Sequence, residues 1–289
     1  MKKTIESKFE IRLDFKRETV DPSRLFISFA EIIEGLKGLD HLISESVNSK
    51  IKSNIILDDI EKGSLIGKFY DRLIVSEEGA IDDAHNEEKI EEFVENSRAE
   101  SLKFLADEKS SVEDLDILKT RIEEIAEETE IAKTFNYSKP DILKLAKVIN
   151  NINDSTEKLS QHESYELKSN RNEVKGIKTG TPKIDIEAVE DSLTEDKIIN
   201  DSTLFYLIKK PDFLGDSAWG FKLGKKAISV KILDEKWIKK FHAGQIVVVP
   251  GDSLKVLVRQ TSKYNRNRYL ISEKLEILEV LDVIHNSKL

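Results

Sequence analysis

The most chemically suggestive stretch of the sequence is a run of basic and aromatic residues near the C-terminus. Between Arg259 and Tyr269 the chain carries four cations, two tyrosines and two asparagines, and no acidic residue. Small β-barrels bind oligonucleotides through such loops, with cations on phosphates and aromatic rings stacked on bases. The run therefore predicts a nucleic-acid-binding loop whose candidate contact residues are Arg259, Lys263, Tyr264, Arg266 and Arg268.

The same run has a second interpretation, a solvated hairpin whose charges only prevent the pairing of exposed strand edges. Lysines elsewhere in the C-terminal segment enlarge the basic surface, namely Lys209, Lys210, Lys225, Lys226, Lys231, Lys239 and Lys240. The acidic N-terminal half argues against sequence-independent binding over the whole protein surface, because phosphate binding depends on positive charge.

Two short acidic motifs are similar to those of metal-dependent nucleases. Pro211-Asp212 precedes Asp234-Glu235-Lys236, and that chemistry needs two carboxylates on a divalent ion with a lysine near the attacking water. The two motifs do not share a strand, and Asp234 has the position of a helix cap. A nuclease is therefore the third functional hypothesis.

Other catalytic and cofactor signatures are missing. The sequence has no phosphate-binding loop and no glycine-rich dinucleotide turn, so we expect no cofactor. His85 and Glu88 have a spacing that a metal site could use, but the interpretation we favour is a solvated acidic helix start. His242 ends a short predicted helix, where it can interact with the helix dipole, and the alternative is a functional base.

Composition places the chain among cytoplasmic proteins with small cores. Of its 289 residues, 39% are hydrophobic and 35% charged, against the usual ~45% and ~25%. The absence of Cys excludes disulfides and thiolate chemistry. We expect no membrane association, because no apolar run approaches the ~20 residues of a membrane span. The N-terminal lysines lack the apolar run of a signal peptide.

Charge divides the chain into modules. Residues 1–160 hold 24 basic and 36 acidic side chains, residues 161–201 hold 6 and 10, and residues 202–289 hold 16 and 9. The net charges of −12, −4 and +7 sum to the −9 of the whole chain. Together with the hydrophobic patterns described below, these charges predict four modules. They are a β-α-β-β module over 1–81, an acidic helical segment over 82–159, a polar linker with at most one short strand over 160–201, and a basic small β-barrel over 202–289.

The N-terminal module is predicted from periodicity. Hydrophobic residues from Phe9 to Phe15 alternate with charged ones, which is typical of a strand with one buried face. Asp21-Pro22 opens a helix, with Asp as N-cap and Pro at the first position. Gly35 and Gly38 would let this helix lie close on a sheet. Two extended runs around Glu61-Lys62-Gly63-Ser64 indicate a hairpin.

The middle and the C-terminal segment show opposite patterns. Three helices with narrow apolar stripes and acidic faces follow, the last one starting after Asp141. The acidic faces serve solubility or dock a basic partner. In the C-terminal segment, short β-rich runs surround one helix capped by Asp234 and predict a small barrel of the OB or SH3 kind. The predicted strands are 203–208, 219–223, 227–232, 245–249, 253–258 and 269–283.

The β-α-β-β module, with its Ile60-Glu61-Lys62-Gly63-Ser64-Leu65 turn, resembles the start of poorly characterised bacterial proteins encoded near mobile elements and antiviral defence genes. In those proteins a helical middle and a small C-terminal barrel often follow. The resemblance implies a regulatory, sensing or assembly role in antiviral defence and carries no catalytic residues with it.

Together these features predict an α+β protein without enzymatic activity. The leading hypothesis is an interaction, sensor or assembly protein with a protein partner. We also expect a homo-oligomer formed through the N-terminal and helical segments. The alternative is a nucleic-acid-binding accessory protein that uses the basic loop.

Overall fold

The computed structural model describes residues 3–16, 19–49, 51–61, 65–75 and 84–286. It is an α+β chain that divides into two compact units, Met1–Val189 and Glu190–Leu289. The helices between residues 84 and 155 share one hydrophobic core with the N-terminal sheet. The boundary between the units falls inside α6 (Ile186–Leu193).

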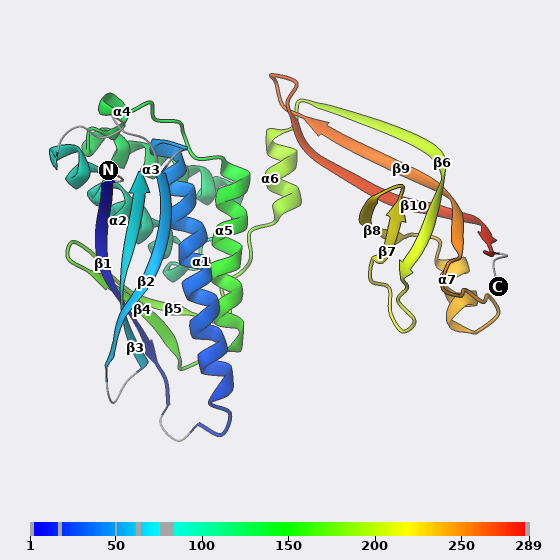
Figure 1. The fold of residues 1–289 in the computed structure, drawn as a ribbon, viewed down its shortest axis with the longest axis horizontal. Helices are drawn as coiled ribbons and strands as arrows, with labels where there is room; N and C mark the ends of the chain where they lie inside the picture. The colour runs from blue at the N-terminus through cyan, green and yellow to red at the C-terminus, as the bar shows by residue number, and fades with distance from the viewer. Residues whose placement is uncertain (1–2, 17–18, 50, 62–64, 76–83, 287–289) are drawn as a thin grey trace. The chain divides into compact units, whose positions relative to one another are not determined.

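The first unit is built on a five-stranded antiparallel sheet (Figure 1). The predicted β-α-β-β order is confirmed, and the strand order is β2-β3-β1-β4-β5. The first four of these strands have the arrangement of the split β-α-β, ferredoxin-like fold. Its elements are β1 (Lys3–Asp14), α1 (Ser23–Val47), β2 (Ile51–Glu61), β3 (Leu65–Val75), β4 (Ser164–Ser169) and β5 (Glu173–Lys178).

The core of this unit lies between one sheet face and the helices. Phe9, Ile11 and Leu13 of β1 are buried, whereas the alternate positions face solvent, as the periodicity predicts. Asp141 caps the last long helix by accepting a hydrogen bond from the Lys144 N–H at 2.9 Å. The helices between β3 and β4 are α2 (Ala84–Ala106), α3 (Val112–Glu128), α4 (Ile131–Thr134), α5 (Ile142–Ser155) and η1 (Thr156–Lys158).

Residues 160–201 are not a linker, which corrects the expectation from the sequence. They supply β4 and β5, and β4 pairs with β1. Buried Glu95 of α2 holds the turn between them, because its Oε1 accepts the Arg171 N–H at 2.8 Å and its Oε2 the Arg171 Nη1 at 2.7 Å. The hairpin looks polar because only one of its faces is buried.

Two details of α1 also differ from expectation. The N-cap residue is Pro22, and Asp21 instead accepts a hydrogen bond from the Ser23 hydroxyl at 2.6 Å. Gly35 lies against α5 and not against the sheet, because an added Cβ would meet Ile152 Cγ1 at 2.8 Å. The predicted turn at residues 62–64 lies outside the described residues, although the strands on either side of it pair as expected.

A fully buried charged cluster connects α1, α2 and β3 of the first unit. Arg98 of α2 donates two hydrogen bonds to Asp40 of α1, at 2.7 and 2.8 Å, and lies 4.4 Å over the Phe9 ring. Asp71 of β3 places Oδ2 3.9 Å from Arg98 Nη2 and accepts the Ser53 hydroxyl at 2.7 Å. Burial and the Asp40 carboxylate raise the pKa of Asp71 to about 7, against the opposing effect of Arg98.

The second unit is a closed five-stranded barrel, which confirms the predicted small barrel. Its cyclic strand order is β6-β7-β8-β10-β9, β8 and β10 are parallel, and α7 separates β8 from β9. This topology is the OB arrangement and not the SH3 one. The elements are β6 (Asp196–Lys210), β7 (Trp219–Leu223), β8 (Lys226–Ile232), α7 (Glu235–His242), β9 (Ser253–Tyr264) and β10 (Leu270–Ile284).

An aromatic cluster fills the barrel and fixes α7 against it. Trp219 and Phe221 of β7 pack with Trp237 and Phe241 of α7, with ring centroids between 4.9 and 6.1 Å apart. The strand expected at residues 245–249 is absent, and that stretch is irregular. The barrel closes through β6, β7, β8, β10 and β9 without this segment. Strand β6 begins well before residue 202.

Candidate nucleic-acid interface

The outer face of β7 and β8 carries lysines. In β7 the buried Trp219 and Phe221 face inward, so Gly220 and Lys222 face outward. The ladders place Lys222 opposite Leu207 of β6 and Ala227 of β8, and Gly220 opposite Lys210 and Ser229. Strand alternation puts Lys231 on this same face. Three adjacent strands therefore contribute lysines to one surface.

The centre of this surface is shallow. Its middle positions are Gly220, Ala227 and Ser229, which have small side chains. A Cβ at Gly220 would lie 3.1 Å from the Cβ of Lys210, so the base of that lysine lies against the glycine. A flat floor of small residues bordered by cations can accept a polyanionic strand along its length.

Most of these lysines have no acidic partner. Five of them form no ion pair with any residue that the structure describes: Lys209, Lys210, Lys222, Lys225 and Lys226. We call these five the lysine face: Lys210 and Lys222 point outward from β6 and β7, and Lys209, Lys225 and Lys226 lie beside them, at the end of β6 and at the β7–β8 turn. At its border Lys231 pairs with Asp216 at 3.3 Å, and both side chains are well exposed. Unpaired exposed cations keep their full charge available to a ligand.

The loop between β6 and β7 adds apolar groups beside the lysine face. Phe213 is 61% exposed and Leu214 is 96% exposed. Phe213 rests on Phe241 of α7, with ring centroids 5.5 Å apart. Asp212 accepts hydrogen bonds from the backbone N–H groups of Leu214 and Gly215, at 3.0 and 2.9 Å. The hydroxyl and the backbone N–H of Ser217 also donate hydrogen bonds to Asp212. Together these bonds, above all the one from the Ser217 hydroxyl, lower the Asp212 pKa and hold the loop in place.

Two of the five residues predicted to bind nucleic acid are committed to contacts within the chain. Arg259 lies within β9 and donates two hydrogen bonds to Asp201, at 2.9 and 2.8 Å. Lys263 is nearly buried and pairs with Asp191 at 2.8 Å and Glu190 at 3.4 Å. Both were expected in a loop, but β9 extends to Tyr264. Their charges are neutralised before any ligand arrives.

The remaining predicted residues lie at or beside the tip of the β9–β10 hairpin. Asn265 organises the turn by accepting the N–H groups of Asn267 and Tyr269, at 3.0 and 2.9 Å. Arg266 and Arg268 are exposed, and Tyr264 is half-buried. Tyr269 is 70% exposed and does not enter the barrel, so it joins Tyr264 as a stacking candidate. The tip lies well away from β7 and β8 (Figure 1), so it is separate from the lysine face.

The nuclease-like carboxylates have structural roles. Asp234 caps α7 by accepting the Trp237 N–H at 3.0 Å, as predicted, and its second oxygen accepts the Val280 N–H at 3.2 Å. Asp212 holds the β6–β7 loop. The side chain of His85 lies outside the described part, and among the described residues no group of three or more acidic or histidine residues could hold a metal ion.

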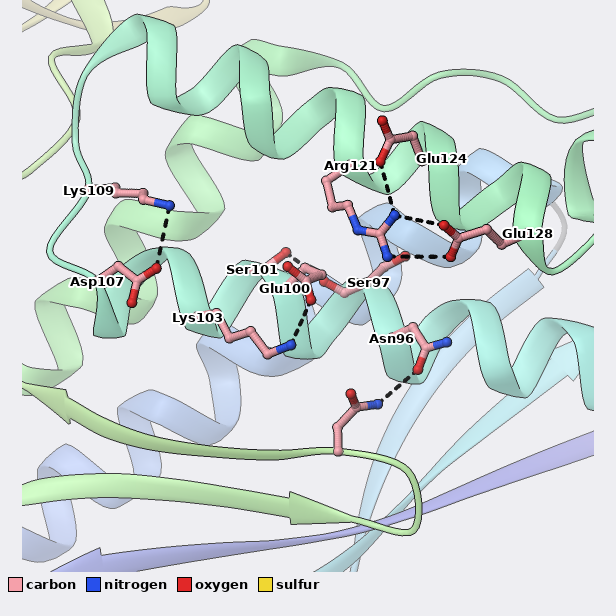
Figure 2. Close-up of polar contacts among 11 residues, drawn as sticks. Asn96, Ser97, Glu100, Ser101, Lys103, Asp107, Lys109, Arg121, Glu124 and Glu128 are labelled. Atoms are coloured by element: carbon pink, nitrogen blue, oxygen red, sulfur yellow. Dashed lines mark hydrogen bonds and ion pairs between the residues drawn. The ribbon is translucent and has the colours of Figure 1, made fainter.

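The acidic helix faces are partly neutralised within the first unit. Arg121 of α3 contacts Glu124 at 3.0 Å and Glu128 at 2.8 Å (Figure 2). Asn96 of α2, labelled in Figure 2, accepts a hydrogen bond from Asn172 of the β4–β5 turn; the distance is 2.8 Å. The Arg121 contacts neutralise part of the acidic face within α3, whereas the Asn96 hydrogen bond joins α2 to the β4–β5 turn.

Comparison with known proteins assigns no function to this chain. No protein-family model, no curated protein and no solved structure matches this chain. None of the described helices combines the length and apolar character needed to cross a membrane. The resemblance to defence-associated proteins stays a prediction.

Lys222 is the main residue that sequence reasoning missed. The alternation Trp219, Gly220, Phe221, Lys222 already indicates that Lys222 points away from the barrel core. The basic run at 259–269 drew attention because its cations are consecutive in sequence. The lysine face is instead assembled from three strands.

Proposed function

We propose that this protein is a non-enzymatic binding protein whose barrel binds single-stranded nucleic acid across the lysine face. The observation that carries the proposal is the OB topology with five lysines on and around its β7–β8 surface that pair with no acidic group among the described residues. OB barrels bind oligonucleotides and oligosaccharides on this surface and its flanking loops. Unpaired lysines favour the phosphate-bearing ligand of the two.

The neighbouring groups support a single strand over a duplex. Phe213 in the β6–β7 loop exposes an aromatic ring that can stack on an unpaired base. Charge supports confinement of binding to the barrel. Residues 190–289 hold 17 basic and 14 acidic side chains, net +3, whereas residues 1–189 hold 29 and 41, net −12. The first unit therefore repels polyanions, and the barrel presents the cations.

The test measures salt dependence with the full-length protein and a labelled single-stranded oligonucleotide. Each phosphate contact contributes about −0.7 to the log–log slope, so five lysines give about −3.5. Affinity should then fall about 100-fold between about 50 and 200 mM salt. Replacing Lys210, Lys222 and Lys226 with Ala should reduce the slope to about −1.4.

A matched variant separates this surface from general positive charge. Lys236, Lys239 and Lys240 are exposed on α7, and their replacement with Ala removes the same charge. This control should keep the original slope. If the protein binds no oligonucleotide at low salt, or if both triple variants weaken binding equally, the proposal is wrong. If the double variant with Arg266→Ala and Arg268→Ala abolishes binding and neither triple lysine variant does, the binding site is the tip of the β9–β10 hairpin.

The expectation of an interaction or assembly role remains as a second candidate function. One observation favours it: on the side away from β9, no strand in the described part of the chain pairs with residues 196–206 of β6.

A further inference from the structure

One long strand of the barrel has an unpaired edge. Residues 196–206 of β6 pair with β9 on one side, and β6 meets β7 only at positions 207–210. On the other side of residues 196–206, the described part of the chain supplies no partner strand. In Figure 1 this part of β6 runs along the outside of a three-stranded extension formed with β9 and β10.

This edge is regular and open. Twelve consecutive pairs, from Asp196–Tyr264 to Leu207–Ser253, join β6 to β9 without a register shift. Residues 196–203 are all exposed, and they include the apolar Ile198 and Ile199. The stretch contains no Pro or Gly. Natural edges are usually blunted by proline, bulges or a covering element, because unpaired N–H and C=O groups are a template for another strand.

The charges along the edge are arranged to match a second copy of themselves. We propose that β6 pairs antiparallel with β6 of a second copy of this chain, about a twofold axis at Ile199. In that register Lys197 faces the copy's Asp201, Asp201 faces the copy's Lys197, and the two Ile199 side chains meet at the axis. A twofold interface of this kind is self-complementary.

Neighbouring registers lack this match. A twofold axis pairs residues of the same sheet face, so the neighbouring registers have their axes at Ile198 and at Asn200. An axis at Ile198 brings Glu195 against the copy's Asp201, and an axis at Asn200 leaves Lys197 opposite Thr203. Like charges directly opposite each other destabilise a sheet, whereas opposite charges stabilise it.

The ladders within the chain extend the charge pattern. Glu276 of β10 lies opposite Arg259 of β9, and Arg259 lies opposite Asp201 of β6. The copy's Lys197 would continue this row with alternating sign. Within its own sheet Lys197 lies opposite Lys263, so an anion on its free side offsets a like-charge neighbour. The result is a continuous six-stranded sheet with one barrel, and one lysine face, at each end.

This assembly is independent of whether the lysine face binds nucleic acid, and its test measures mass alone. Light scattering of the full chain should give twice the 33.0 kDa of the monomer. Ile199→Lys places two charges at the axis and should give a monomer. Leu281→Lys introduces the same charge at an exposed position of β10 and should remain a dimer. A monomeric native protein, or a dimer unaffected by Ile199→Lys, overturns the proposal.

Crosslinking tests the register without depending on how the charge variant folds. The chain has no cysteine, so Ile199→Cys and Thr203→Cys each introduce a single thiol. In the proposed register the two thiols at position 199 are directly opposite and should crosslink under mild oxidation. Those at position 203 are about 26 Å apart along the strands and should not. Crosslinking at 203, or at neither position, contradicts the register.

Discussion

Asp71 makes the stability of the first unit depend on pH near neutrality. Its carboxyl is buried between the sheet and two helices, and its neighbours are Asp40 on α1, Arg98 on α2 and Ser53 on β2. Ser7 is the cross-strand neighbour on β1. Burial and the Asp40 charge raise the pKa of Asp71 from 3.8 to about 7. The folded protein therefore holds a proton that the unfolded chain releases.

The sign and size of the effect follow from this difference in proton binding. Stability from this group is greatest below about pH 4 and falls as pH rises to about 7, and it is constant above that. Each pH unit in the interval lowers the free energy of unfolding by about 1.4 kcal/mol. The loss across the interval is about 4 kcal/mol.

Asp71→Asn should remove this dependence. The amide keeps an acceptor for the Ser53 hydroxyl and carries no charge, so it resembles the protonated carboxyl. The free energy of unfolding of the variant, minus that of the native protein, should rise by about 4 kcal/mol from pH 4 to pH 8. Urea titration at several pH values, followed by the circular dichroism of the helices, measures the difference.

The second unit provides an internal control. Both tryptophans, Trp219 and Trp237, lie in the barrel, so tryptophan fluorescence follows its unfolding separately. That transition should not respond to Asp71→Asn. Ser53→Ala removes a hydrogen bond that lowers the pKa of Asp71, so it should extend the fall in stability to higher pH. A difference between Asp71→Asn and native protein that stays within about 1 kcal/mol from pH 4 to 8 would refute the reasoning.

Two further predictions concern packing and capping. Gly35→Ala should destabilise the first unit by about 1–3 kcal/mol, because its Cβ would meet Ile152 at 2.8 Å, whereas Gly38→Ala has 3.9 Å to Val148 and should stabilise α1 by up to about 1 kcal/mol. Urea titration of the two variants and the native protein measures these changes in the free energy of unfolding. Equal effects of the two substitutions would contradict the close approach of α1 and α5. Asp234→Ala should cost the barrel about 1 kcal/mol through loss of the α7 cap, measured by tryptophan fluorescence. Magnesium-dependent cleavage of DNA or RNA by the native protein that disappears in this variant would show that the residue is catalytic instead.

Features that depend on neighbours within a few residues could be predicted from the sequence. The alternation from Phe9 to Leu13 identified a strand and its buried face. Asp234 was predicted as a cap, and a cap needs only the N–H group three residues ahead. The strand at 219–223 and the helix capped by Asp234 were also predicted, because their apolar residues recur with the spacing of a strand and of a helix. These choices rest on local sterics and hydrogen bonding.

Features that depend on distant partners could not be predicted in this way. Arg259 and Lys263 are cations in the sequence, but their acidic partners lie 58 or more residues away and meet them only through the β6–β9 ladder and the end of α6. The β4–β5 hairpin resembled a linker because its buried face and the Glu95 contact appear only when it joins β1.

The lysine face combines both kinds of information. The sequence by itself determined that a basic barrel segment follows an acidic first unit, and that Lys222 alternates with buried aromatic residues. Only the tertiary structure decided that lysines from β6, β7 and β8 share one surface while Arg259 and Lys263 of β9 are neutralised. The reason is that alternation along a strand fixes which way a side chain points, whereas its neighbours are set by strand order and register across the closed barrel.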